Sequence, residues 1–254
     1  MTLRVVITGA SSGIGRALAA EYAQRGATLG LIARRGEALQ QLAADLKVPS
    51  ALYSLDVRDA AGLARAAEDF IGKFGMPDVV VANAGVSAGT LTEHVEDTAV
   101  FREILDTNLV GVVNTFQPFV TPMRAASRGT LVGIASVAGF RGLPGASAYS
   151  ASKAAAIAYL ESLRLDLHGT GVSVVTICPG YVATPMTEHN PYPMPFMLPA
   201  AVAARRMANA IERRKTFVVI PWQMGVVGAV LKVLPRPLYD ALFARAPRKP
   251  RRAG

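Results

Sequence analysis

Short runs of apolar and β-branched residues recur along the chain, and longer segments with helical periodicity separate them. Strands are predicted at residues 3–8, 28–33, 50–55, 79–82, 130–136, 172–178 and 216–220. Strands that alternate with helices are typical of βαβ units around a parallel sheet. The pattern therefore predicts an α/β fold, a doubly wound parallel sheet of about seven strands with helices on both faces.

The predicted helices begin and end at capping residues. Residues 14–25 place their apolar side chains on one face and stop before Gly26, and Asp59 has the type and position of an N-cap for a helix that ends near Phe74. No tandem repeat or linker interrupts the alternation. We expect one domain over residues 1–220, with residues 221–254 as an apolar and basic helical extension of it.

A proline-rich loop lies between the sixth and seventh predicted strands. Pro191, Pro193, Pro195 and Pro199 are mixed with apolar residues there, and this spacing excludes a helix or a central strand. Ligands of open α/β sheets bind beyond the carboxyl ends of the strands, and this loop leaves such an end. We expect it to form a mobile lid over a substrate at about residues 185–210.

Composition indicates a globular chain whose excess charge is local. Hydrophobic residues make up 51% of the 254 positions and charged residues 18%. The formal net charge is +9, yet residues 1–204 carry 15 Lys/Arg against 16 Asp/Glu, whereas residues 205–254 carry 12 against 2. The basic excess therefore marks the C-terminal end, where aromatic residues that could stack on bases are sparse. We expect no nucleic-acid partner.

Cysteine and histidine usage gives no support for a disulfide or a metal site. Cys178 is the only cysteine, as fits a small buried thiol in a reducing compartment. His94, His168 and His189 lie in unrelated segments without paired ligand spacing. The first residues lack the regions of a secretory signal, so we expect a cytoplasmic protein.

A glycine-rich turn follows the first predicted strand and opens the first helix. Glycines permit a tight turn and a close approach of backbone N–H groups to a pyrophosphate, and the helix N-terminus favours an anion. The spacing is Gly-x3-Gly-x-Gly, which differs from the commoner Gly-x-Gly-x-x-Gly. The residues expected to contact the pyrophosphate are Gly9, Ser11, Ser12, Gly13, Ile14 and Gly15.

The end of the second predicted strand bears on the choice of cofactor. NAD-binding sites of this kind place a carboxylate there for the ribose 2′-hydroxyl, but this strand ends in Ala33-Arg34-Arg35. Two guanidiniums suit a 2′-phosphate, so the sequence favours NADP (NADPH) over NAD. Asp56 and Val57, after the third strand, are predicted to meet the adenine edge.

Four residues form a candidate catalytic group. Tyr149 and Lys153 are four apart and share one helix face, and Ser136 ends the fifth predicted strand. An isolated Tyr-x3-Lys pair occurs often by chance. Its combination with Ser136, Asn108 and the glycine-rich turn makes chance a poor explanation.

With these motifs the sequence resembles the short-chain dehydrogenase/reductase family over nearly its whole length. The resemblance implies a Rossmann-type fold and an NAD(P)-dependent enzyme that interconverts a carbonyl and an alcohol by hydride transfer. One departure is Ala82, where many members carry a second asparagine. The matching positions are the turn at residues 8–15, Asn83-Ala84-Gly85, Asn108, Ser136, Tyr149, Lys153, Pro179-Gly180 and Thr184.

The resemblance also implies a role for each matching residue. Tyr149 would be the general acid in reduction, and because a free phenol has a pKa of about 10, it needs the positive charge of Lys153 to work near neutrality. Lys153 would also hold the nicotinamide ribose, Ser136 would stabilise charge on the substrate oxygen, and Asn108 would support a water chain. The remaining implied cofactor contacts are Asn83, Ala84, Gly85, Pro179, Gly180, Val182 and Thr184.

Other functions and partners stay open. A cofactor-binding regulatory protein with the same fold and little turnover is the alternative, although it would not need Ser136, Tyr149 and Lys153 together. Apolar lid residues with Tyr181 and Tyr192 favour an apolar carbonyl or alcohol substrate, but they could equally serve subunit packing. The resemblance implies a homodimer or homotetramer formed through helices at about 98–126 and 147–168.

The C-terminal extension has two interpretations. Residues 222–231 are apolar nearly all round but too short to span a membrane, which takes about 20 residues. In one interpretation the helices pack over the substrate cleft or a partner subunit, and the basic tail is solvated. In the other they lie in the membrane interface, with Trp222 at headgroup level and the cations near anionic lipid. The cations of the tail are Arg245, Arg248, Lys249, Arg251 and Arg252.

Overall fold

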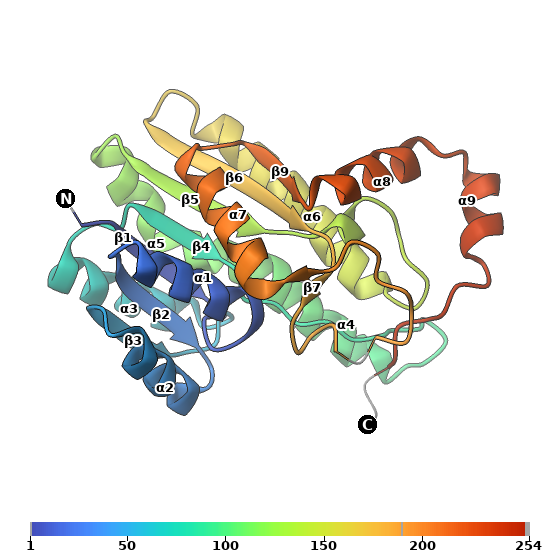
Figure 1. The fold of residues 1–254 in the computed structure, drawn as a ribbon, viewed down its shortest axis with the longest axis horizontal. Helices are drawn as coiled ribbons and strands as arrows, with labels where there is room; N and C mark the ends of the chain where they lie inside the picture. The colour runs from blue at the N-terminus through green and yellow to red at the C-terminus, as the bar shows by residue number, and fades with distance from the viewer. Residues whose placement is uncertain (1, 189, 252–254) are drawn as a thin grey trace.

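The computed structural model describes residues 2–188 and 190–251, and it shows a parallel sheet between two layers of helices (Figure 1). His189 and Arg252, which the sequence pattern places in a loop and in the basic tail, lie outside the described residues. Within the described residues the strands of this sheet are β1 (Arg4–Thr8), β2 (Thr28–Ala33), β3 (Ser50–Ser54), β4 (Val79–Ala82), β5 (Gly129–Ile134), β6 (Val172–Pro179) and β9 (Phe217–Ile220).

The sheet has the strand order β3-β2-β1-β4-β5-β6-β9, with every neighbouring pair parallel. All residues of β2, β4 and β5 are buried, because helices cover both faces of the sheet. The chain runs outward from β1 to β3 and then returns to place β4 on the other side of β1. The order therefore reverses between β1 and β4, which opens a crevice at their carboxyl ends. The predicted α/β fold is confirmed.

The described residues contain nine α-helices, with a short π-helical turn and a 3-10 turn. The prediction for residues 14–25 is confirmed within one residue, and the Asp59 side chain caps α3 by accepting a hydrogen bond from the Gly62 N–H at 2.9 Å. The helices are α1 (Gly13–Gln24), α2 (Gly36–Leu46), α3 (Ala60–Phe74), α4 (Asp97–Leu105), α5 (Gly111–Ala125), α6 (Ser147–Asp166), α7 (Ala200–Glu212), α8 (Trp222–Val233) and α9 (Arg236–Phe243), with the turns η1 (Asp106–Val110) and η2 (Val137–Gly139).

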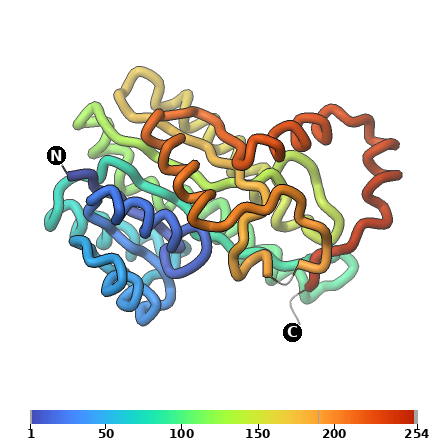
Figure 2. Tube along the Cα trace, in the orientation of Figure 1, coloured from blue at the N-terminus to red at the C-terminus, as the bar shows by residue number. Residues whose placement is uncertain are grey.

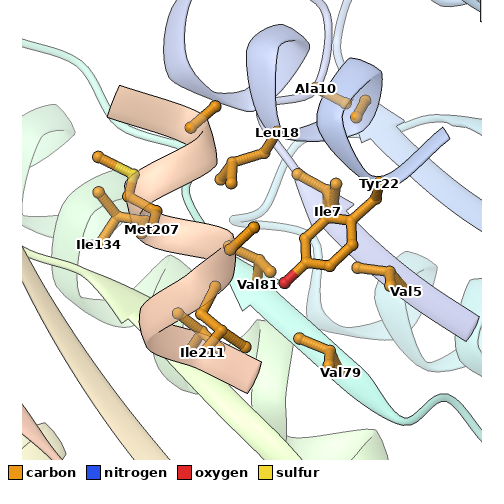
Figure 3. Close-up of a cluster of buried hydrophobic side chains, with 14 of the residues drawn as sticks. Val5, Ile7, Ala10, Leu18, Tyr22, Val79, Val81, Ile134, Met207 and Ile211 are labelled. Carbon is orange, nitrogen blue, oxygen red and sulfur yellow. The ribbon is translucent and has the colours of Figure 1, made fainter. Parts of the chain in front are cut away.

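Alternating side chains of each strand divide between two cores. Val5 and Ile7 pack under α1, α2 and α7, as Figure 3 shows around Leu18 and Tyr22, whereas Val6 faces α3, α5 and α6. The helix predicted at about 98–126 runs without a gap from Asp97 to Ala125, with the π-helical turn η1 between its α-helical parts α4 and α5.

The segment predicted as a lid at 185–210 divides into a loop and a core helix. Two short strands, β7 (Val182–Ala183) and β8 (Leu198–Pro199), pair at the base of the loop. Residues from 200 onward belong to α7, whose Ala203, Ala204 and Met207 are fully buried against α1 and the sheet. The loop between the two short strands therefore covers only residues 184–197. Residues from 200 onward do not belong to a lid, because the apolar face of α7 packs in the core.

The C-terminal tail contacts the rest of the chain near residue 251, whereas the side chains of Arg245 and Arg248 are exposed, so the basic tail is only partly solvated. Figure 2 shows the chain leaving α8, passing through α9 and returning toward the start of α4. There the Arg251 guanidinium pairs with Asp97 at 2.8 Å and with Glu96 at 2.8 Å. Counting cations along the sequence could not reveal these carboxylates, which lie about 155 residues away.

The buried face of α7 predicts a difference between two methionines. Met207→Ala should lower the free energy of unfolding by about 2–5 kcal/mol, because the fully buried side chain leaves a cavity in the core. Met197→Ala, in the proline-rich loop where the side chain is 39% exposed, should change it by less than about 0.5 kcal/mol. Urea unfolding of both variants measures this, and equal destabilisation would show that α7 is not a core helix.

Candidate active site

A cleft of about 390 Å³ lies at the carboxyl edge of the sheet. Its size is typical of ligand sites, and its walls come from the loops that follow β1, β2, β3, β4, β5 and β6. Every residue that the sequence assigned to the site lines this cleft except Gly15 and Asn108. Parallel strands bring these positions together because their carboxyl ends meet at one edge of the sheet.

The glycine-rich turn leaves no room for side chains at two positions. Gly9 has a φ of +67°, and a Cβ atom there would lie 2.8 Å from the Cα of Ala84. A Cβ atom on Gly15 would overlap the carbonyl oxygen of Gly9, so this glycine lets α1 begin directly against the turn. The backbone at the start of α1 therefore borders the cleft without side chains in front of it, and this cradle fits a dinucleotide pyrophosphate.

Hydrogen bonds from Thr8 and Asn83 join the turn to the neighbouring strand. The Thr8 hydroxyl accepts hydrogen bonds from the N–H groups of Asn83 at 3.1 Å and of Ala84 at 3.2 Å. The Asn83 amide donates to the Thr8 carbonyl at 2.9 Å. Asn83 thus braces the turn with its side chain. The sequence motif included Thr8, but the contribution of its buried hydroxyl was not foreseen.

The arginine pair lies at the end of the cleft that follows β2. Arg34 and Arg35 are exposed, and Arg35 donates a hydrogen bond to the Ser11 hydroxyl at 3.1 Å. Asp56 lies on the same wall, but its carboxylate accepts hydrogen bonds from the Arg58 side chain at 2.7 and 3.0 Å. These bonds hold the pKa of Asp56 below its usual range. Arg58, which sequence reasoning missed, therefore engages the carboxylate on this wall of the cleft.

The catalytic candidates converge on the other end of the cleft. Ser136 follows β5 and caps η2, where its hydroxyl accepts the Ala138 N–H at 3.1 Å. Tyr149 and Lys153 come from the first turns of α6, and the Lys153 ammonium lies 5.9 Å from the centroid of the Tyr149 ring. The same ammonium donates a hydrogen bond to the Ile134 carbonyl at 2.8 Å. This bond fixes a buried cation beside the phenol.

Burial dominates the protonation of this pair. It raises the pKa of the Tyr149 phenol, and the hydrogen bond from the Ser136 hydroxyl opposes that change. Burial also lowers the pKa of Lys153 to about 8, so the amine remains mostly protonated at neutral pH. The pKa of Tyr149 is therefore raised and not lowered as the resemblance implied, because loss of solvation disfavours the phenolate and only the Ser136 hydrogen bond opposes it.

Asn108 lies behind the cleft, in the π-helical turn η1. The oxygen of its side-chain amide accepts a hydrogen bond from the Val86 N–H at 2.8 Å. The nitrogen of the same amide donates hydrogen bonds to the Val86 carbonyl at 3.0 Å and to the Ser152 hydroxyl at 3.0 Å. Ser152 in turn donates to the Tyr149 carbonyl at 2.8 Å. Single π turns often occur at functional sites, and this one connects the loop after β4 to the catalytic helix. Sequence reasoning missed Ser152, which provides that connection.

An aromatic pair joins the segment before β7 to the proline-rich loop near Tyr149. The rings of Tyr181 and Tyr192 are 6.5 Å apart, and Tyr192 is close enough for its phenol to interact electrostatically with that of Tyr149. Cys178 is free and buried, as the sequence predicted. Among the described residues, no three His, Cys, Asp or Glu side chains are placed to hold a metal ion.

Comparison with known proteins identifies the family. Residues 4–193 match the short chain dehydrogenase family. The chain belongs to the short-chain dehydrogenase/reductase family. It is 41% identical over 243 residues to an uncharacterised oxidoreductase of Myxococcus xanthus, covering 94% of this chain and 96% of that protein. It is 38% identical over 192 residues to 11-beta-hydroxysteroid dehydrogenase A of Sesamum indicum, covering 74% of this chain but only 55% of that protein.

Solved structures of this short-chain dehydrogenase/reductase fold are similar over most of the chain. A Burkholderia phymatum member in complex with NAD has a TM-score of 0.83 at 25% identity, covering 98% of this chain and 97% of that one. An alcohol dehydrogenase of Thermococcus sibiricus complexed with 5-hydroxy-NADP has a TM-score of 0.77 at 26% identity, covering 87% and 96%. This short-chain dehydrogenase/reductase is therefore an NAD(P)-dependent enzyme.

The brace at Thr8 predicts a loss of both stability and cofactor binding. Thr8→Val keeps the shape of the side chain but leaves the N–H groups of Asn83 and Ala84 without their acceptor, which should cost about 1–3 kcal/mol of unfolding free energy. Binding of the NAD(P) cofactor should weaken as well, because the turn loses its anchor. Thr8→Ser keeps the hydroxyl and serves as the control. Urea unfolding and cofactor titration measure the two effects, and equal behaviour of Val and Ser variants would contradict the role of the hydroxyl.

Proposed function

We propose that this short-chain dehydrogenase/reductase uses NADP to interconvert a carbonyl and an alcohol, with Tyr149 as general acid and base, on an apolar substrate. The observation that carries the proposal is the convergence of Ser136, Tyr149 and Lys153 on one end of a cleft that begins at a glycine-rich turn. A protein that only bound the cofactor would have no need of a proton donor, a hydroxyl and a fixed ammonium in this arrangement.

The chemistry divides among these three side chains. When bound, the nicotinamide supplies or accepts the hydride. The Ser136 hydroxyl hydrogen-bonds the substrate oxygen and stabilises the negative charge that develops there. Tyr149 donates its phenolic proton to that oxygen in reduction and accepts the proton in oxidation. The Lys153 ammonium, fixed on the Ile134 carbonyl, stabilises the phenolate that remains.

Asn108 supports this group from behind the cleft. Its hydrogen bonds to Val86 and Ser152 hold the loop after β4 against α6, so that Lys153 stays beside Gly85. We assign it to the water chain that resupplies the proton through Lys153.

Removal of the phenolic proton should abolish most of the turnover. Tyr149→Phe keeps the ring but cannot transfer a proton, so kcat should fall about 10²-fold or more. Tyr159→Phe is the matched control, because it removes a phenol from the same helix on the side that packs in the core, and kcat should hardly change. Steady-state kinetics with a carbonyl substrate measures both. A Tyr149→Phe enzyme with near-normal turnover would refute the assignment.

Arg34 and Arg35 support NADP as the cofactor. The solved relatives include complexes with NAD and with an NADP derivative, so the choice depends on the residues of this chain. Both guanidiniums line the cleft where a 2′-phosphate would lie, and the nearby carboxylate of Asp56 is engaged by Arg58. A phosphate there would meet positive charge on two sides.

The double variant Arg34→Ala/Arg35→Ala tests this choice. Charge-assisted hydrogen bonds contribute about 1.5–3 kcal/mol each, so NADPH should bind about 10²-fold to 10⁴-fold more weakly, while NADH should be nearly unaffected. Arg65→Ala removes an exposed arginine of α3 outside the cleft and controls for net charge. Fluorescence titration with both cofactors measures the effect. Equal affinity of the wild-type enzyme for NADH and NADPH would contradict the proposal.

The surroundings of Tyr149 support an apolar substrate. Tyr192, whose ring packs near that of Tyr181, interacts electrostatically with Tyr149, and Met186 lines the cleft. Several relatives carry the name 11-beta-hydroxysteroid dehydrogenase, and a steroid is an apolar substrate. Val110 and Leu165, which are exposed on the π-helical turn before α5 and on α6, support a homodimer or homotetramer formed through these helices.

A face of the C-terminal helices supports contact with a membrane surface. Trp222, Val226 and Val230 are spaced by four along α8 and are 69%, 55% and 55% exposed. Basic side chains on the same extension suit an anionic lipid surface. In the described part of the chain no helix has both the length and the apolarity to cross a bilayer. The proposed contact is therefore peripheral.

Substitution on this face tests the membrane contact. Val226→Glu/Val230→Glu should abolish co-sedimentation with phosphatidylserine vesicles, and added salt should weaken binding of the wild type. Val95→Glu, at an 85% exposed position in the loop before α4, is the control and should bind like the wild type. Truncation after Pro235 is less suitable because it also removes the ion pairs of Arg251. Co-sedimentation of the double variant at the wild-type level would exclude this face.

A further inference from the structure

The last described residues, 248–251, form a strap across two loops beside the catalytic helix. The Gly89 N–H donates a hydrogen bond to the Pro250 carbonyl at 2.8 Å. A Cβ atom on Gly89 would overlap the carbonyl oxygen of Lys249, and one on Gly145 would lie 2.8 Å from the Cβ of Arg248. Both loops therefore carry a glycine at the point where the strap passes, which leaves room for its backbone.

A buried carboxylate anchors the end of the strap. Asp97, whose side chain is 7% exposed, accepts hydrogen bonds from the Arg251 guanidinium at 2.8 and 3.0 Å and from the Leu91 N–H at 2.7 Å. Hydrogen bonds to Arg251 and Leu91 hold the pKa of Asp97 below its usual range. The strap is therefore attached to the start of α4 by charge-assisted hydrogen bonds, which are stronger than neutral ones.

This anchorage places a second cation at the catalytic tyrosine. The Lys249 ammonium lies 5.7 Å from the centroid of the Tyr149 ring, and that of Lys153 lies 5.9 Å from it. Lys153 lines the dinucleotide cleft but Lys249 does not. Lys249 therefore reaches Tyr149 from the strap, beside the loops at Gly89 and Gly145 and outside the cleft that would hold the dinucleotide.

Lys249 is half-buried without a compensating charge. Burial lowers the pKa of its amine, and among the described residues no carboxylate offsets this effect. A partly desolvated cation is unfavourable unless an anion or several acceptors pair with it. Arg251 of the same tail shows the contrast, because it pairs with two carboxylates.

We propose that Lys249 binds a carboxylate of the substrate, so that the preferred substrate is a carbonyl compound with an apolar body and a carboxylate near the reactive carbonyl. The inference rests on the proposed function, since it takes Tyr149 as the group that meets the substrate oxygen. Lys249 is then a specificity-determining residue, and the ion pairs of Arg251 position it. The binding of the carboxylate replaces the water that the half-buried ammonium has lost.

A binding experiment tests this assignment without requiring turnover. The probes are 2-naphthoate and 2-naphthamide, which have the same apolar body and differ in charge. Calorimetric titrations use the wild-type protein with NADPH and without it. We expect 2-naphthoate to bind about 10-fold more tightly than 2-naphthamide, on the scale of one charge-assisted hydrogen bond. With NADPH bound, the phosphate-binding arginines are covered and do not compete for the carboxylate.

Three variants assign the preference to this side chain. Lys249→Met keeps the apolar stem and should reduce the affinity ratio to about one, whereas Lys249→Arg should retain most of it. Lys215→Met removes an exposed lysine that follows α7 and should keep the full ratio, as a control for net charge. A wild-type ratio near one, absence of naphthoate binding, or an unchanged ratio in Lys249→Met would each overturn the proposal.

The two proposals fail in distinguishable ways. If the enzyme transfers hydride to uncharged ketones and the naphthoate preference is absent, only the role of Lys249 is wrong. If naphthoate binds through Lys249 but Tyr149→Phe retains normal turnover, the carboxylate site stands and the proposed role of Tyr149 falls.

Discussion

Parallel hydrogen bonding in one register is the constraint on which the rest of the structure depends. Each neighbouring pair of strands from β3 to β9 is parallel, so all their carboxyl ends lie along one edge. The turn after β1, Asn83 after β4 and Ser136 after β5 meet there, although they are far apart in sequence. Burial of both sheet faces maintains this register, because a shift of one residue would exchange the two cores.

Buried polar contacts then set the geometry at that edge. Thr8 and Asn83 tie β1 to β4, Asn108 ties the following loop to α6, and Lys153 is held on the last residue of β5. A buried donor or acceptor without a partner costs about 1–3 kcal/mol, so these contacts disfavour other arrangements of the loops as well as stabilising this one. The site is therefore assembled by the same hydrogen bonds that stabilise the sheet edge.

The sequence predicted the fold and most of the positions that line the cleft, because both depend on local patterns. Apolar runs marked every strand of the main sheet, and the proton-transfer and charge-stabilising chemistry of side chains such as Tyr149 and Lys153 can be recognised from the residue type and spacing. Partners across the fold were not predictable. Ser152, Arg58 and the carboxylates that hold Arg251 are ordinary polar residues until the chain brings them to their partners. Desolvation of Tyr149 likewise depends on the packing around it and leaves no signal in the sequence.

Hydride transfer to a carbonyl is the central claim, and isotope transfer measures it most directly. The protein is incubated with NADPH that carries deuterium at the transferring position of the nicotinamide and with a panel of apolar ketones, half of them bearing a carboxylate. We expect mass spectrometry to find alcohol products with one deuterium on the former carbonyl carbon. Absence of deuterated alcohol across the panel, with NADPH bound to the protein, would contradict a carbonyl reductase and favour a cofactor-binding protein with little turnover.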